Sequence, residues 1–246
     1  MLARQFCHWP VPVAEAGTVL CVGLHLEDMA AWASQCAAFT TGQERQEASR
    51  FAHMADAVRH LTGRALARRM LWALGGQNSV APFARTPYGK PFCPQTTADF
   101  SISHSAEMVW VALCRTANVG IDVEQVHPLP DAADLTAQLH PQERHALLAL
   151  PAGELETAFF RCWTRKEAVL KTCGTGLNTP LNSFCVHTGT QQNSWILSLP
   201  AATTRLPQSN APETVPWTSH DIATTAAYQC SVAASSPHLE VLVRVF

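Results

Sequence analysis

Two clusters of charged residues in the second half of the sequence could do chemistry together. The first is Gly-Ile-Asp-Val-Glu at 120–124, in which Asp122 and Glu124 are separated by one valine. Side chains alternate between the two faces of a strand, so a strand here would place both carboxylates on one face, about 7 Å apart. Such carboxylates repel each other unless water or a cation lies between them. Taken alone, the pattern also fits an exposed strand with a polar outer face.

The second cluster is Trp-Thr-Arg-Lys-Glu-Ala-Val-Leu-Lys at 163–171. On a helix, Glu167 lies one turn after Trp163, at the edge of an apolar stripe. A surface ion pair between Glu167 and Lys171 is the simpler interpretation, but it leaves Trp163 and the following Gly-Thr-Gly unexplained. Three carboxylates from a strand and a helix suit a hard cation such as Mg2+, with Lys166 and Lys171 beside them to hold phosphates. This combination is typical of phosphoryl transfer.

Two further groups precede these clusters. His104 stands between two hydroxyls, Ser103 and Ser105, and the three side chains together could bind a phosphate. A single histidine near a strand is also a common structural hydrogen-bonding residue. The turn Tyr-Gly-Lys-Pro at 88–91, preceded by Arg85, offers an aromatic face, an open backbone and two cations. By itself this turn is equally consistent with an ordinary exposed loop.

The hydrophobic pattern predicts the elements that position these groups. Short β-branched runs predict strands at 18–26, 109–114 and 119–124, the last two being neighbours joined by a turn. Helical periodicity predicts one helix over 44–74, with Phe51 and Met54 on its apolar stripe, and another over 154–172 that Gly174 ends. Residues 81–98 are predicted to be loop, 135–148 to be partly helical, and the remainder to be strands around a polar excursion at 201–216. The repeated order of strand, helix and strands predicts an α+β fold of two halves, residues 1–117 and 118–246.

Composition narrows the class of protein. Of the 246 residues, 47% are hydrophobic and 15% charged, which predicts a globular protein. The net charge of −2 argues against a nucleic-acid-binding protein. The nine cysteines form no Cys-x-x-Cys pair, which is typical of a reducing compartment and argues against a zinc site. Because apolar runs are short, we expect a cytoplasmic protein without a membrane span.

These motifs resemble those of a known family. Gly-Ile-Asp-Val-Glu at 120–124 followed by Trp-x-x-Lys-Glu-Ala-x-x-Lys at 163–171 is the paired signature of the 4′-phosphopantetheinyl transferases. The Gly-Lys-Pro turn at 89–91 and Ser-Ile-Ser-His-Ser at 101–105 resemble the monomeric, surfactin-synthetase-activating type. The resemblance covers about residues 50–184 and, more loosely, the whole chain. It implies two pseudo-symmetric α+β halves with coenzyme A bound between them.

The resemblance also implies an activity and a set of roles. Such an enzyme transfers the 4′-phosphopantetheine group from coenzyme A to a serine of an acyl or peptidyl carrier protein and releases 3′,5′-ADP. Either Glu167 or Glu124 would accept the serine proton. Lys171 would stabilise the leaving group. The remaining implied roles are Mg2+ binding by Asp122, Glu124 and Glu167, diphosphate contacts by Lys166 and Lys171, an adenine and ribose pocket at Arg85, Tyr88, Gly89, Lys90 and Pro91, and a 3′-phosphate site at Ser103 and His104.

Several alternatives stay open. A metal-dependent nuclease or phosphodiesterase could use similar carboxylates, and a non-catalytic module could bind coenzyme A or a carrier protein. The sequence does not distinguish Mg2+ from Mn2+ or one carrier class from another. It departs from the family at Glu44 and Glu47, where a basic residue that meets the 3′-phosphate is common, so Arg45 or Arg50 would have to substitute. Leucines within 126–151, including Leu135, Leu139 and Leu147, are expected to dock the carrier.

Overall fold

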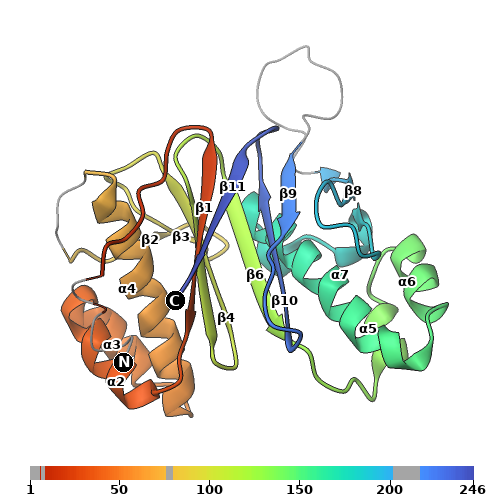
Figure 1. Ribbon diagram of the computed structural model, residues 1–246, viewed down its shortest axis with the longest axis horizontal. Helices are drawn as coiled ribbons and strands as arrows, with labels where there is room; N and C mark the ends of the chain where they lie inside the picture. Colours follow the sequence, from red (N-terminus) through yellow and green to blue (C-terminus); the bar gives the residue numbers. More distant parts are fainter. Residues whose placement is uncertain (1–5, 7–8, 76–79, 202–216) are drawn as a thin grey trace.

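The computed structural model describes residues 6, 9–75, 80–201 and 217–246, in which two large β-sheets pack face to face with helices on their outer sides (Figure 1), beside two small two-stranded sheets. A long helix, α4 (Met54–Ala73), covers the first sheet, and another, α7 (Ala152–Cys173), covers the second. The layers are therefore helix, sheet, sheet and helix. Most of the predicted polar excursion at 201–216 lies outside the described residues.

The first half contributes a mixed sheet and its covering helices. Its sheet has the order β11-β1-β5-β4, in which β1 runs antiparallel to β5 and parallel to β11. The elements of this half are β1 (Thr18–His25), α2 (Met29–Cys36), α3 (Gly42–Ala48), α4, β2 (Ala84–Arg85), β3 (Pro91–Phe92), β4 (Asp99–Ser105) and β5 (Met108–Cys114).

The second half contributes an antiparallel sheet of order β6-β10-β9 and three α-helices in the described residues. The division at residue 117 stays a prediction. One strand does not follow it: β11, the last strand of the chain, pairs with β1 in the sheet of the first half. The elements are β6 (Val119–Gln125), α5 (Ala132–Thr136), α6 (Pro141–Leu148), α7, β7 (Cys185–Val186), β8 (Ile196–Ser198), β9 (Thr218–Asp221), β10 (Tyr228–Ala234) and β11 (Glu240–Val245).

The two sheets are held together by the apolar side chains on their facing sides. Cys21 and Trp110 from the first sheet and Ile121, Val123 and Val232 from the second are buried in one cluster. Burying several large apolar side chains stabilises the folded state by about 1.5–3 kcal/mol each. Because strand side chains alternate, the neighbours of these residues point to the other face of each sheet. In the first sheet they face the covering helices, and in β6 they are the carboxylates Asp122 and Glu124.

The long elements match the predicted ones in most respects. The predicted strand at 18–26 and helix at 154–172 are confirmed as β1 and α7, and Gly174 ends α7 in the left-handed conformation at φ 69°. The single helix over 44–74 is wrong: α3 and α4 are separate, because the backbone at His53 is extended. As a result Phe51 and Met54 lie on the surface, 43% and 67% exposed, instead of on an apolar stripe.

The strands that carry the sequence motifs differ more from the predicted ones. Residues 109–114 and 119–124 form β5 and β6 as predicted, but these strands belong to different sheets and are not hydrogen-bonded neighbours. The residues of the Ser-Ile-Ser-His-Ser segment lie in a strand, β4, which was not predicted and which takes the place beside β5. The predicted α+β fold of two halves, each with a sheet and a long covering helix, is confirmed.

Candidate active site

Helix α7 packs so closely on β6 that only glycine fits at the contact. A Cβ atom on Gly120 would lie 2.1 Å from the carbonyl oxygen of Ala168 and 2.5 Å from the backbone nitrogen of Thr172. The Thr172 hydroxyl shares its one proton between the Ala168 carbonyl at 2.8 Å and, across the contact, the Ala233 carbonyl of β10 at 3.0 Å. Small side chains at one helical spacing thus bring α7 against the sheet, which places Glu167 next to the carboxylates of β6.

Asp122 is the buried centre of the site. Its Oδ1 atom accepts hydrogen bonds from the Lys171 ammonium at 2.6 Å and from the Ser103 hydroxyl at 2.8 Å. Its other oxygen, Oδ2, is buried and has no hydrogen-bond partner among the described residues. Buried carboxylate oxygens are normally paired, so an unpaired one marks a place where a ligand or ion can bind.

The other two carboxylates carry raised pKa values. Burial, followed by the charge of Asp122, raises the pKa of Glu167 from 4.5 to about 7. The same two causes raise the pKa of Glu124, although Ser105 donates a hydrogen bond to it at 2.8 Å. Burial is the larger cause of both shifts, and the negative charge of Asp122 adds to it although Lys171 acts in the opposite direction. The prediction that the strand and the helix bring these three carboxylates together agrees with this geometry.

The two lysines of the signature lie in different places. Lys171 lies in the carboxylate site, as predicted. Lys166 is fully buried on another side of α7, where its ammonium donates to Glu143 of α6 at 2.8 Å and to the Phe184 carbonyl at 2.9 Å. It also lies 3.9 Å from the centre of the Phe184 ring. The prediction that Lys166 contacts a diphosphate is therefore wrong for this structure, because no solvent reaches its ammonium.

Ser103 and His104 lie on opposite faces of β4. The Ser103 hydroxyl points to the carboxylates and is already engaged with Asp122 and Lys171. It is therefore not free to hold a 3′-phosphate, contrary to expectation. His104 faces the other way and has its side chain exposed at the surface; desolvation by the surrounding atoms, then the charges of Lys171 and Arg59, lowers its pKa to about 4. A neutral imidazole held among cations is well placed to meet an anion.

The predicted nucleotide segment splits between two environments. Arg85 is exposed and pairs with Glu47 at 3.2 Å, and Tyr88 is 57% exposed at the turn that Gly89 forms with φ 90°. Lys90 instead donates to Asp99 at 2.5 Å and to the Val119 carbonyl at 2.9 Å, so its ammonium joins β4 to β6. The pocket role predicted for Lys90 does not fit this pairing. Pro91 begins β3 and, with Arg85, lines a cavity of about 30 Å3.

Sequence reasoning missed two basic residues on α4 beside this segment. Arg64 lines the same small cavity, and its guanidinium lies 3.1 Å from Nδ1 of His60. The Nε2 atom of His60 is buried and unpaired among the described residues, and burial, then Arg64, lowers the pKa of His60 to about 4. Their spacing of four residues on a helix was the available signal.

The acidic residues that depart from the family pattern have structural partners. Glu44 accepts from Arg68 at 2.9 Å and from the backbone nitrogen of Thr41 at 2.8 Å, where it completes a capping box. Glu47 pairs with Arg85, which satisfies its charge at the protein surface. Of the two expected substitutes, Arg45 donates to the carbonyls of Ala37 and Thr40 and is thus not available, whereas Arg50 is exposed.

Comparison with known proteins agrees with this site. Residues 118–233 match the model of the 4′-phosphopantetheinyl transferase superfamily, and residues 28–116 match that of the 4′-phosphopantetheinyl transferase N-terminal domain. The chain is 33% identical over 208 residues to 4′-phosphopantetheinyl transferase psf-1 of Bacillus pumilus, covering 83% of this chain and 84% of that protein. It is 30% identical over 183 residues to the transferase HetI of Nostoc, covering 72% of each, and 33% identical over 153 residues to Sfp of Bacillus subtilis, covering 60% and 66%.

The two-half fold and the buried carboxylate site thus define a group-transfer enzyme. The chain belongs to the 4′-phosphopantetheinyl transferase superfamily. It is an enzyme of that type, and neither a nuclease nor a non-catalytic module has support from these matches. Within the described part of the chain, no helix is long and apolar enough to span a lipid bilayer.

Proposed function

We propose that the enzyme takes 4′-phosphopantetheine from coenzyme A and attaches it to a carrier-protein serine, with Mg2+ bound by Asp122, Glu124 and Glu167. Among the described residues no three acidic, histidine or cysteine side chains already stand as a preformed metal group, so binding requires some side-chain rearrangement. The unpaired Asp122 Oδ2 and the raised pKa values of both glutamates fit a missing positive charge. Carboxylate oxygens are the ligands that Mg2+ and Mn2+ both accept, and we propose Mg2+. When bound, the ion would neutralise charge on the diphosphate.

Lys171 and Glu167 have different roles in the proposed transfer. The serine oxygen forms a bond to the β-phosphorus of coenzyme A while the bond to the bridging oxygen breaks, which releases 3′,5′-ADP. Lys171, which has room to move because it is only half-buried, places its ammonium beside the leaving group. We assign the serine proton to Glu167, since Asp122 and Glu124 each accept a hydrogen bond from a serine of β4, whereas Glu167 accepts none from the described residues.

The basic residues around the small cavity are proposed to receive the nucleotide end of coenzyme A. Arg64 and Arg85 line that cavity, and His60 and His104 have pKa values lowered in part by Arg64 and Lys171, respectively. A bound phosphate would offset the charge of the neighbouring cations and supply an acceptor for His60 Nε2. We therefore assign the 3′-phosphate to His104 with these residues of α4 instead of to Ser103. Tyr88 and Gly89 remain proposed neighbours of the adenosine.

Intact-mass spectrometry of an apo carrier protein tests the whole proposal. With this protein, coenzyme A and Mg2+, the carrier should gain the mass of one phosphopantetheine group. The gain should vanish with EDTA and with Glu167→Ala. Acyl, polyketide and peptidyl carriers should each be tried, because the carrier class is open. A coenzyme A complex that modifies none of them would contradict the proposed function.

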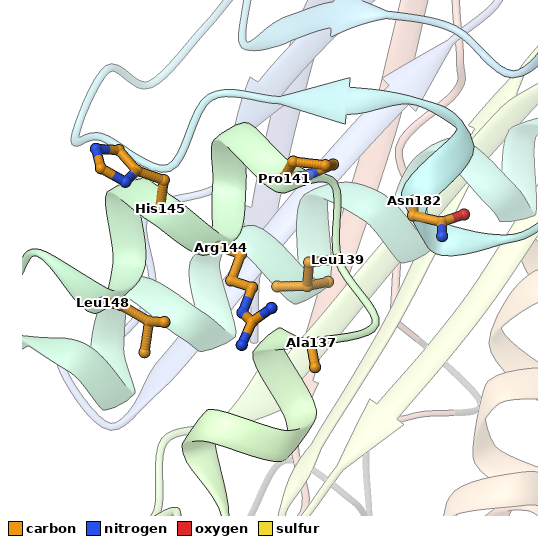
Figure 2. Close-up of a pocket in the computed structure, with 7 residues that line it drawn as sticks. All are labelled: Ala137, Leu139, Pro141, Arg144, His145, Leu148 and Asn182. Carbon is orange, nitrogen blue, oxygen red and sulfur yellow. The ribbon is translucent and has the colours of Figure 1, made fainter.

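The surface expected to dock the carrier is only partly as predicted. Leu139 and Leu147 are buried in the core of the second half and Leu135 is half-buried, so these three do not form an exposed apolar face. Beside them lies a groove of about 380 Å3 between α5 and α6, where Leu148 is 48% exposed. Figure 2 shows Arg144 extending from α6 toward the end of α5 within this groove. The residues that line it are Ala137, Leu139, Pro141, Arg144, His145, Leu148 and Asn182.

We expect the carrier to occupy this groove with an apolar side chain flanked by acidic residues, since Arg144 supplies the complementary charge. Leu148→Asp and Arg144→Glu should each raise the KM for carrier protein by about tenfold, which corresponds to ~1.4 kcal/mol, and leave the KM for coenzyme A unchanged. Leu177→Asp, at an exposed leucine outside the groove, is the matched control. Equal carrier kinetics in all three variants would rule out this surface.

The oligomeric state and the cellular location of the protein stay predictions. A monomer is predicted because the two halves of one chain together form the site. A cytoplasmic location is predicted from the cysteines, of which the eight described are free thiols.

A further inference from the structure

Strands β4 and β6 lie at the meeting edges of the two sheets and are joined by side chains instead of backbone hydrogen bonds. Every second backbone N–H of β6 donates to a side-chain oxygen of β4, and each pair is separated by twenty residues. The pairs are Val119 with Asp99 at 2.8 Å, Ile121 with Ser101 at 3.2 Å, Val123 with Ser103 at 3.3 Å, and Gln125 with Ser105 at 3.1 Å. We call these four pairs the side-chain ladder.

Two serines of the ladder also hold a carboxylate of β6. The Ser103 hydroxyl accepts from Val123 and donates to Asp122 Oδ1 at 2.8 Å. The Ser105 hydroxyl accepts from Gln125 and donates to Glu124 Oε2 at 2.8 Å. Each hydroxyl therefore fixes the backbone of β6 and the carboxylate of the preceding residue at the same time. A hydroxyl has one proton to donate, so both serines have their proton committed to a carboxylate.

Ser101 has the same backbone contact without the carboxylate. Its hydroxyl accepts from Ile121, and the residue that precedes Ile121 is Gly120, which has no side chain to receive a hydrogen bond. The chain thus contains two kinds of serine in one setting, one that only joins the strands and one that also orients an acidic residue.

We propose that Ser103 and Ser105 are positioning residues for the metal site, which hold Asp122 and Glu124 in the orientation that binds the ion. The site is then built jointly, with the carboxylates on a strand of the second half and their orienting hydroxyls on a strand of the first. This inference rests on the proposed metal site. Groups that hydrogen-bond to metal ligands commonly change metal affinity by about 10–100-fold when they are removed.

Metal affinity tests the proposal without turnover. Mn2+ binding, followed by electron paramagnetic resonance with coenzyme A absent, should weaken about tenfold or more in Ser105→Ala. Ser101→Ala should bind Mn2+ within about twofold of the wild-type protein, although it loses the same kind of strand contact. Ser105→Thr keeps a hydroxyl on a residue that suits a strand, and it should restore most of the affinity. Equal Mn2+ affinity in Ser105→Ala and Ser101→Ala would overturn the proposal.

Two further measurements separate the orientation of a carboxylate from a general loss of structure. In a Glu124→Gln background, Ser105→Ala should have no further effect on Mn2+ affinity, since the carboxylate that it orients is gone; an undiminished effect would contradict the proposed role.

If Ser105→Ala does not fold, as circular dichroism would show, Ser103→Ala is compared with Ser101→Ala in the same titration. Should neither Glu124→Gln nor Glu167→Gln weaken Mn2+ binding, the proposed metal site itself fails. A loss in these two but not in the serine variants refutes only the positioning role.

Discussion

Replacing Glu167 with glutamine is expected to lower kcat/KM for carrier modification on the order of 10²–10⁴-fold, the range that a general base contributes. Glutamine has nearly the same shape but can neither accept the serine proton nor add a negative charge to the proposed metal site. The initial rate of carrier modification at saturating coenzyme A measures this effect. Glu156→Gln, on the same helix but outside the site, is the control that should keep full activity. An active Glu167→Gln variant would exclude both roles.

The same substitution should change how stability depends on pH. In the folded protein the pKa of Glu167 is about 7, above its ordinary 4.5, so between these pH values the folded state holds a proton that the unfolded chain has released. The contribution of this proton to the free energy of unfolding is fully present below about pH 4.5 and is lost as the pH rises through 7. The loss is on the order of 1–3 kcal/mol.

Thermal melts at pH 5 and pH 8 give the measurement. Without metal, the wild-type protein should lose more Tm between these pH values than Glu167→Gln does. Added Mg2+ should then stabilise the wild-type protein at pH 8 and have little effect on the variant, since a metal binds the deprotonated carboxylate. Parallel pH dependence in both proteins would show that Glu167 titrates normally.

The parts of the site that could be predicted from the sequence depend on local geometry. The alternation of β6 places Asp122 and Glu124 on one face, and the helical spacing of α7 relates Glu167 to Lys171. Both relations hold within one element, so they can be read without knowing the fold. The fold class followed from the same periodicities, because the order of strands and helices repeats.

The parts that could not be predicted depend on contacts between distant elements. The ladder requires that β4 lie beside β6, and no local pattern in Ser-Ile-Ser-His-Ser identifies its partner strand. Arg64 was missed because no pattern within its helix shows that Arg85 and Pro91 lie beside it. Lys166 was misassigned for a similar reason: its partner Glu143 lies on α6, and a charged residue inside the signature motif suggested a ligand contact instead of a buried pair.

Substitution of Lys166 is expected to change the stability of the protein without changing its binding of coenzyme A. Lys166→Met should lower the free energy of unfolding by about 3–5 kcal/mol, because it leaves the Glu143 carboxylate buried beside an apolar group. Glu143 would retain hydrogen bonds from the backbone nitrogens of Val186 at 2.7 Å and His140 at 2.9 Å, but it would have no cation. Urea unfolding measures the loss. Lys171→Met also removes the cation beside a buried carboxylate, Asp122, but the Lys171 side chain is 27% exposed, so this variant should differ from Lys166→Met mainly by losing far more activity.

The double variant Lys166→Met/Glu143→Gln decides between a structural and a catalytic role. Removing both charges leaves no uncompensated ion, so the double variant should be more stable than Lys166→Met alone, even though one residue more is changed. Measured below its melting temperature, it should also bind coenzyme A with an unchanged Kd, since neither side chain reaches the site. If Lys166 instead contacted the diphosphate, the Kd would rise in Lys166→Met and stay raised in the double variant. Recovery of stability with a normal Kd would establish that the first lysine of this signature connects α6 to α7, while Lys171 alone faces the substrate.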